Sequence, residues 1–334
     1  MVLIDGYGGY VPLYRIERDE IYSQYGGSGS GESAVPGHDE NHVTMASEAA
    51  GVALDRAGVS AEDLGAVCTA SITDPFAEHG IAANVAFRLG APQSVRTGDF
   101  RSTGRAATDA LCFARQFVAA TDEPALVVGV DVMPAEPDSE DEPYAGAGAG
   151  AVVLRTDADD PGGRIDAVGQ STTGFVERHR LHDEPAVHGD GAFEGEYGFG
   201  EAIESATGSA LAETDVEFDH AIVTASDHRM ARGAVESVPG EVSMVSTFDD
   251  VGYAGTASFF LDLASLLETA SAGDGAVAAA YGAGGADVVV LETDDGVGAE
   301  GSTVAAQIDA KEYVSYGKHL QYRERTEYQG ASGV

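Results

Sequence analysis

The stretch Thr97–Leu111 comes nearest to an acyl-transfer site in residue types and spacing. Its pattern predicts a strand end, a tight glycine turn and the start of a helix. A helix N-terminus offers free N–H groups and positive potential, which stabilise a thiolate or an oxyanion. The turn carries Gly104 and Arg105 and no cysteine. The stretch therefore has the architecture that displays a nucleophile, without the nucleophile itself.

Polar side chains near this turn offer an alternative chemistry. Ser102 and Thr103 lie just before the glycine, and His228 lies in the second half of the chain. A hydroxyl within hydrogen-bond reach of an imidazole is an activated nucleophile, so a pair of Ser102 or Thr103 with His228 stays open. The same residues also fit turns and helix caps, which is the role that we favour.

Histidines gather in a second polar region. His179, His182 and His188 lie in an acidic segment that would suit either a metal ion or a solvated loop. We favour the solvated loop and expect no metal site. We expect the acidic run Glu136–Glu142 to be a solvated loop as well.

The composition is that of a strongly acidic folded protein. The 334 residues carry a formal net charge of −38, with 56 Asp and Glu against 18 Lys and Arg. This charge repels nucleic acids and anionic lipids, so neither is expected as a partner. The 43% of hydrophobic residues favours a halophilic folded protein over a disordered chain. In 1 M salt the Debye length is only about 3 Å, so the salt ions screen the repulsion between the acidic side chains and a folded chain can tolerate this charge.

The cysteines and the hydropathy of the sequence indicate in which cellular compartment the protein is expected. Cys68 and Cys112 each lie in an apolar run, which predicts buried packing rather than a disulfide or zinc site. No apolar run reaches the roughly 18 residues of a membrane span, and no basic leader begins the sequence. We therefore expect a cytoplasmic protein.

Short apolar strands alternate with amphipathic helices along the chain, as in α/β proteins. The predicted strands are 65–70, 126–130 and 149–154, and the predicted helices are 43–57, 81–89 and 106–119. The glycine runs Gly146–Gly150 and Gly282–Gly285 precede strands, whereas a dinucleotide fingerprint follows one. We therefore expect close-packed turns there instead of a nucleotide site.

The second half of the chain repeats the first. Val67–Ser71 resembles Ile222–Ser226, Gly104–Ala107 resembles Gly255–Ser258, and Gly146–Asp157 resembles Gly282–Asp294. The three similarities keep one order, which predicts an internal duplication. We expect two α/β halves, residues 1–160 and residues 161–334 with a C-terminal tail, each built on its own sheet.

Four blocks carry a family resemblance over nearly the whole chain. They are Gly6–Ile16, Val35–Met45, Tyr281–Gly284 and Tyr313–Tyr316. Together with the duplicated order, they resemble the archaeal 3-hydroxy-3-methylglutaryl-CoA synthase family, whose product leads to mevalonate and isoprenoids. The resemblance implies a thiolase-like fold, in which duplicated βαβ halves form a five-layer αβαβα sandwich.

The resemblance also implies a chemistry that this sequence does not match. The family joins acetyl-CoA to acetoacetyl-CoA with a cysteine that is acetylated, a glutamate that moves a proton, and a histidine helped by an asparagine. When the blocks are aligned without gaps, these positions fall on Gly104, Ile72, Thr224 and Tyr253, respectively. Glycine cannot attack a thioester, and isoleucine cannot carry a proton. We therefore predict that the family's reaction centre has been lost.

Three functions follow as hypotheses. The preferred one is a non-catalytic structural or regulatory subunit of an acyl-CoA complex of the thiolase and synthase type. The alternatives are an acyl-CoA acyltransferase or condensing enzyme with an altered mechanism, and an acyl-CoA-binding protein. We expect no required cofactor, but a coenzyme A thioester is a candidate ligand whose phosphates Arg105 and Arg229 would hold.

The resemblance further implies partners. Proteins of this fold form dimers through their central sheets, so we expect a homodimer or a heterodimer with a thiolase-fold paralogue. A thiolase and a small OB-fold, zinc-ribbon protein are further expected partners.

Overall fold

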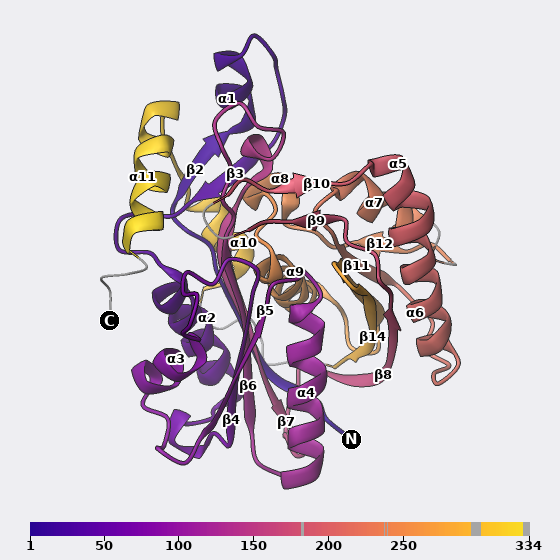
Figure 1. Cartoon of the computed structure of the whole chain (residues 1–334). Helices are drawn as coiled ribbons and strands as arrows, with labels where there is room; N and C mark the ends of the chain where they lie inside the picture. Colours follow the sequence, from indigo (N-terminus) through magenta and orange to yellow (C-terminus); the bar gives the residue numbers. More distant parts are fainter. Residues whose placement is uncertain (182–183, 237, 239, 295–301, 330–334) are drawn as a thin grey trace.

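A ten-stranded mixed sheet organises the chain (Figure 1). The computed structural model describes residues 1–181, 184–236, 238, 240–294 and 302–329. In this part of the chain the strand order is β12-β11-β13-β14-β8-β1-β7-β6-β4-β5. The N-terminal strands are β1 (Leu3–Tyr10), β4 (Ala66–Ser71), β5 (Arg96–Arg101), β6 (Ala125–Val132) and β7 (Ala147–Arg155). The C-terminal strands are β8 (Gly163–Thr172), β11 (His220–Thr224), β12 (Ser243–Met244), β13 (Gly275–Gly282) and β14 (Gly285–Thr293).

The two halves of the sheet repeat one another. The strands β5-β4-β6 and β12-β11-β13 run parallel, and in each half the next two strands are antiparallel to their neighbours. The halves meet where Leu3 pairs with Arg164 and Ile4 with Gly163. The expectation of a separate sheet in each half was wrong, because this short pairing makes one continuous sheet. The division at residue 160 stays a prediction.

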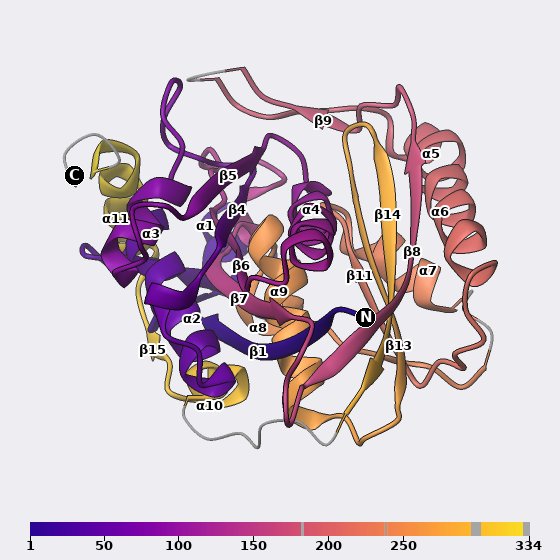
Figure 2. The same cartoon turned by 90° about the horizontal axis from the view of Figure 1, so that it is seen from below.

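Helices lie on both faces of the sheet and between its two halves (Figure 2). The outer helices are α2 (His42–Ala57) and α3 (Ala82–Leu89) on the N-terminal half, and α6 (Glu201–Leu211) and α7 (His228–Glu236) on the C-terminal half. The central helices are α4 (Ala106–Thr121) and α9 (Thr256–Thr269). Three apolar cores fill the spaces between these layers. The five-layer αβαβα sandwich expected from the sequence is confirmed.

Local signals in the sequence set the ends of α2. The Asn41 side chain accepts from the Thr44 N–H while the Thr44 hydroxyl accepts from the Asn41 N–H, which is a capping box. Gly58 ends the helix in the left-handed conformation that favours glycine. The predicted helix 43–57 therefore differs from the observed one by a single residue.

The two glycine runs have different roles. Gly282–Gly285 forms the turn between β13 and β14, as expected, with Gly284 at a φ of 95°. Gly146–Gly150 was expected to be a turn, but most of it lies inside β7. A Cβ on Gly150 would lie 2.6 Å from the Cβ of Phe260, so glycine there lets α9 pack close to the sheet.

Smaller elements complete the described structure. The short strands are β2 (Tyr14–Glu17), β3 (Glu32–Val35), β9 (Arg178–His179), β10 (Val187–His188) and β15 (Glu312–Tyr313). The remaining α-helices are α1 (Arg18–Gln24), α5 (Gly191–Phe193), α8 (Phe248–Val251), α10 (Val304–Asp309) and α11 (Tyr316–Gln329). Tighter or wider turns are η1 (Ala61–Asp63), η2 (Glu142–Tyr144) and the π-helical η3 (Glu194–Gly200). None of the helices in the described residues is long and apolar enough to cross a membrane.

Candidate functional site

The turn between β5 and α4 is held against the C-terminal half. The Ser102 N–H donates to the Ser71 carbonyl at 3.0 Å, and Ser102 has a φ of 77°, which is rare for a residue with a side chain. The Thr103 hydroxyl donates to the carbonyl of Ala283 at 3.0 Å. The start of α4 therefore faces the turn between β13 and β14, which is more than 170 residues away in the sequence.

Gly104 has no room for a side chain. A Cβ built on it would lie 2.7 Å from the carbonyl oxygen of Tyr281 and 3.3 Å from the Oη of Tyr253. Real Cβ atoms essentially never approach another heavy atom closer than 3.0 Å. Across the same contact, a Cβ on Gly282 would lie 2.7 Å from the Gly104 nitrogen. Two glycines therefore let the backbones of the two halves touch at this point.

Tyr253 occupies the space next to Gly104. Its backbone N–H donates to the Tyr144 carbonyl at 2.7 Å, and its carbonyl accepts from the Gly146 N–H at 2.9 Å. Burial raises the pKa of the phenol well above its usual value, so the ring is neutral. The side chain therefore acts as uncharged bulk against the start of α4.

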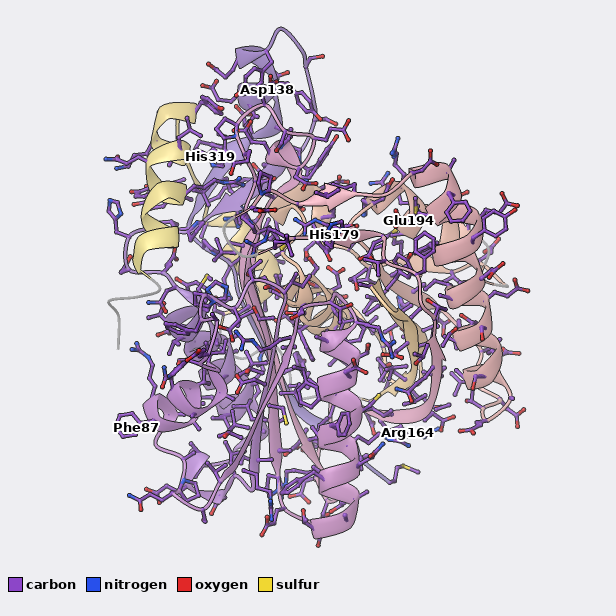
Figure 3. All side chains as sticks on the ribbon, viewed as in Figure 1. Phe87, Asp138, Arg164, His179, Glu194 and His319 are labelled. Atoms are coloured by element: carbon purple, nitrogen blue, oxygen red, sulfur yellow. The ribbon has the colours of Figure 1, made fainter. Side chains whose placement is uncertain are left out.

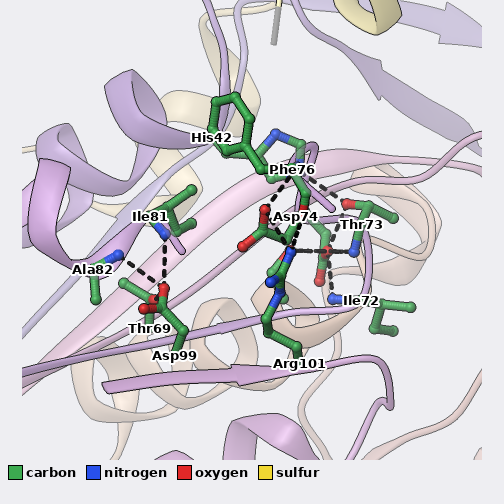
Figure 4. A network of polar contacts seen from close by, with 12 residues as sticks. His42, Thr69, Ile72, Thr73, Asp74, Phe76, Ile81, Ala82, Asp99 and Arg101 are labelled. Atoms are coloured by element: carbon green, nitrogen blue, oxygen red, sulfur yellow. Dashed lines mark hydrogen bonds and ion pairs between the residues drawn. The ribbon is translucent and has the colours of Figure 1, made fainter. Parts of the chain in front are cut away.

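Ile72 directly follows β4 and lies beside the carboxylate of Asp131, which has several hydrogen-bond donors around it. The Asp131 side chain is fully buried, and its Oδ1 accepts from the Ile72 N–H at 2.8 Å. Oδ1 also accepts from the hydroxyls of Ser71 and Thr73 and from the Thr73 N–H, and Figure 4 includes Ile72 and Thr73. Oδ2 accepts from the N–H and the hydroxyl of Thr256. Six donor groups therefore lie within hydrogen-bond distance of its two oxygens, and through them Asp131 joins β4 to α9.

Thr224 and a small cavity complete this region. The Thr224 side chain is buried at the end of β11, and its hydroxyl donates to the Ala279 carbonyl at 3.3 Å. Two residues further on, Ser226 lines a cavity of about 40 Å³. The full lining is Met133, Pro134, Asp141, Tyr144, Ala145, Arg178, Ser226 and Tyr253.

Comparisons with known proteins identify sequences that are similar to this chain over nearly its whole length. No family model matches the chain. The hydroxymethylglutaryl-CoA synthase of Methanopyrus kandleri is 27% identical over 350 residues, which cover 97% of this chain and 98% of that protein. The synthase of Thermococcus gammatolerans is 28% identical over 330 residues, covering 96% and 93%. The chain is a hydroxymethylglutaryl-CoA synthase-like protein.

Solved structures establish the fold of this synthase-like chain. An HMG-CoA synthase complexed with CoA superposes with a TM-score of 0.83 at 18% identity, covering 96% of this chain and 89% of that one. The 3-oxoacyl-(acyl carrier protein) synthase III of Pseudomonas aeruginosa superposes with a TM-score of 0.74 at 22% identity, covering 88% and 98%. The predicted thiolase-like fold is confirmed.

The alternative nucleophile and base are not brought together in this synthase-like chain. The His228 ring stacks on Phe248 with a centroid distance of 3.9 Å, and its Nε2 accepts from Arg232 at 3.0 Å. Burial, followed by the charge of Arg232, lowers the pKa of His228 to about 4, so the ring is neutral near pH 7. Among the residues that the structure describes, no hydrogen bond joins His228 to Ser102 or Thr103.

The two arginines suggested for coenzyme A have different surroundings. The Arg105 guanidinium donates to both oxygens of the buried Asp287, at 3.0 and 3.3 Å, and to the Gly284 carbonyl at 2.9 Å. These contacts commit Arg105 to joining the two halves. Arg229 pairs with Asp227 at 3.0 Å, but its side chain is 92% exposed, so its part in phosphate binding stays a prediction.

The described residues of both segments expected to be solvated loops are largely exposed, and a few of their side chains hold each segment in place. His179 and His188 lie on the paired strands β9 and β10, while His182 lies outside the described residues. The His188 ring contacts Asp141 of the acidic run at 3.0 Å. Glu142, the last residue of that run, is buried and accepts from the Tyr316 hydroxyl at 2.9 Å. No group of three or more His, Cys, Asp or Glu side chains suited to a metal ion occurs within the described ranges.

Buried ionisable groups divide into predicted and missed ones. Cys68 and Cys112 are buried and unpaired as expected, and burial raises the pKa of their thiols to about 11 and about 12, so neither is a reactive thiolate. Sequence reasoning missed Glu177 and Glu194, each only 8% exposed. The Tyr281 hydroxyl is buried without a hydrogen-bond partner in the described structure. Nothing in the local sequence marks Glu177 and Glu194, because distant elements bury them, whereas Tyr281 belongs to a block that the family resemblance had singled out.

Proposed function

We propose that this synthase-like chain does not perform acyl transfer and acts as a structural or regulatory subunit of an acyl-CoA complex. The contact at Gly104 carries the proposal. The position that the family resemblance assigns to the acetylated cysteine has no side chain, and the carbonyl of Tyr281 and the ring of Tyr253 fill the space for one. A nucleophile at this point would require the turn between β13 and β14 to move.

The other assigned positions support the same conclusion. Ile72 has no group that could move a proton, and the carboxylate that accepts from its backbone N–H, Asp131, is held by donors from β4 and α9. The Thr224 hydroxyl donates to a backbone carbonyl. The cavity of about 40 Å³ has room for about three water molecules. This arrangement favours a retained scaffold over a working acyl site.

The edge of the sheet supports a partner of the same fold. β5 is the terminal strand and pairs with β4 alone among the described strands, so its other edge offers free backbone groups. Phe113 of α4 is 58% exposed, and its ring lies tilted against that of Phe100 of β5 with 5.2 Å between the ring centroids; Phe87 of α3 is 87% exposed (Figure 3). We propose that this edge pairs with the equivalent edge of a catalytically complete thiolase-fold paralogue. A thiolase and an OB-fold, zinc-ribbon protein remain proposed members of the complex.

A coenzyme A thioester is the second candidate, as a ligand that does not react. Two similar structures are described as an HMG-CoA synthase complexed with CoA and as MvaS in complex with 3-hydroxy-3-methylglutaryl coenzyme A. In this chain the Arg229 side chain is 92% exposed but pairs with Asp227, so a phosphate would share the guanidinium with that carboxylate. Calorimetry with acetyl-CoA in high salt tests this candidate, with R229Q as the variant that should weaken binding.

The decisive experiment measures condensation of acetyl-CoA with acetoacetyl-CoA. The purified chain, in molar salt, is expected to show no turnover and to keep no label from radioactive acetyl-CoA. The Methanopyrus kandleri synthase, assayed in its own buffer, is the positive control. A stable dimer with an active paralogue, recovered by co-expression, would support the subunit role. Turnover or acyl labelling of the chain alone would overturn the proposal.

A further inference from the structure

The short strands β9 and β10 place two basic side chains, Arg178 and His188, next to the acidic residue Asp141. β9 and β10 pair antiparallel through His179 with Val187 and Arg178 with His188, and they lie below α1, between α8 and α5, in Figure 1. The Gly189 N–H also donates to the Glu177 carbonyl at 2.9 Å. Arg178 and His188 are thus directly opposite one another on neighbouring strands.

Asp141 receives both of these side chains. Its Oδ2 lies 3.0 Å from the Nε2 of His188 and 3.6 Å from a guanidinium nitrogen of Arg178. We call these three residues the Asp141 clasp. Asp141 and Arg178 also line the cavity beside Tyr253 and Ser226. The clasp is therefore part of the cavity wall, and its separation would open that wall.

Two buried carboxyl groups flank the same strands. Glu177 precedes β9, and Glu194 begins η3 shortly after β10; His179 and Glu194 are marked in Figure 3. Glu177 and Glu194 are each 8% exposed as whole residues, and the Oε2 of Glu177 is buried without a hydrogen-bond partner in the described structure. A buried carboxylate without full hydrogen bonding is costly, so charging these groups disfavours the packed arrangement of β9 and β10.

We propose that the Asp141 clasp is a pH-responsive closure of the cavity, which holds β9 and β10 in place at mildly acidic pH and releases them as the pH rises. The proposal concerns access to the cavity and is independent of whether the chain catalyses any reaction.

The facing charges give the direction of the response. The hydrogen bond that His188 donates to Asp141 raises the pKa of His188, whose other charged neighbours are Arg178 and Glu194, so the clasp loses a positive charge as the pH rises through that pKa. Burial, then the charges of Glu177 and Asp227, raise the pKa of Glu194 to about 7, against the opposing effect of His188. The packed arrangement of β9 and β10 therefore favours protonated Glu194, and its stability decreases as the pH rises through about 7. The pKa of Asp141 is below its ordinary value, so Asp141 stays ionised throughout.

Spin-label distances test the proposal on the full chain. Labels at V187C on β10 and Q116C on α4 would report the position of β10, since both native cysteines are buried. Pulsed dipolar spectroscopy is run on samples frozen from about pH 5.5 and about pH 8.5, which bracket the titrating groups. We expect a narrow distance distribution at the lower pH and an about fivefold larger displaced population at the higher pH.

Matched variants assign the response to the clasp. E194Q, which cannot ionise, should keep β10 in place at the higher pH, while H188Q should raise the displaced population already at the lower pH. E201Q, which neutralises an exposed carboxylate of α6, is the control and should behave like the parent. Identical distributions at both pH values in the parent, or an E194Q response equal to that of E201Q, would overturn the proposal.

Discussion

Adding a single methyl group at Gly104 tests the contact on which the proposed function depends. In G104A the new Cβ would lie 2.7 Å from the Tyr281 carbonyl oxygen, which is backbone and cannot rotate away. Overpacking of this kind typically costs about 1–3 kcal/mol. At about 2.1 cal/mol/K per residue, unfolding of 334 residues has an entropy near 0.7 kcal/mol/K, so the melting temperature should fall by about 1–4 °C.

Differential scanning calorimetry in molar salt measures this shift, and G51A provides the matched control. Gly51 lies inside α2, where an added Cβ would meet nothing within 4 Å. Alanine there should instead stabilise the protein by about 0.5–1 kcal/mol. Y253F removes the Oη at 3.3 Å and should recover a small part of the loss in G104A. If G104A melts with the parent, a side chain fits at this position, and the steric argument against a nucleophile is refuted.

Three further predictions concern buried polar groups. D131N should destabilise the protein by about 3–6 kcal/mol in urea unfolding, because an amide nitrogen loses two charge-assisted bonds, such as those from Thr256, at about 1.5–3 kcal/mol each. R105Q should cost about 3–5 kcal/mol because it leaves Asp287 charged and buried, whereas the exposed R229Q should cost under about 1 kcal/mol; equal losses would contradict this assignment. His319 is buried without partners for its ring nitrogens in the described structure, and burial, then Arg323, lowers its pKa to about 3. Stability should therefore fall as the pH drops below about 6.5, by about 2 kcal/mol at pH 5. H319F should lack this part of the pH dependence, measured as urea midpoints at pH 7 and pH 5.

The fold could be predicted because its signals are local and repeated. The alternation of apolar strands and helices and the turn Gly282–Gly285 depend on neighbouring residues, and the structure contains them at or near the expected places. The duplicated order of motifs matches the duplicated strand order. The error at Gly146–Gly150 has a physical reason, since glycine serves both turns and close helix packing, and the distant Phe260 decides between them.

The sequence predicts where along the chain the candidate site lies, but it does not predict which distant groups pack against it. The turn at Gly104 was correctly predicted to precede a helix, yet its contact with the Tyr281 carbonyl spans 177 residues of sequence. The same applies to Asp131, whose donors come from β4 and α9, and to Glu177 and Glu194, which long-range packing buries. The acidic run Glu136–Glu142 is mostly exposed, as expected, but its charge pattern did not reveal that Asp141 contacts β9 and β10 or that Glu142 is buried against α11.

The short pairing of β1 with β8 has a mechanical consequence. Two residue pairs at one end of each strand connect the two half-sheets, and along the remaining length the half-sheets diverge and enclose α4 and α9. The angle between the half-sheets is therefore set by side-chain packing of these helices and by the Arg105–Asp287 ion pair, with little contribution from the backbone. The molecule therefore consists of two half-sheets that are joined at one end, with α4 and α9 packed between them.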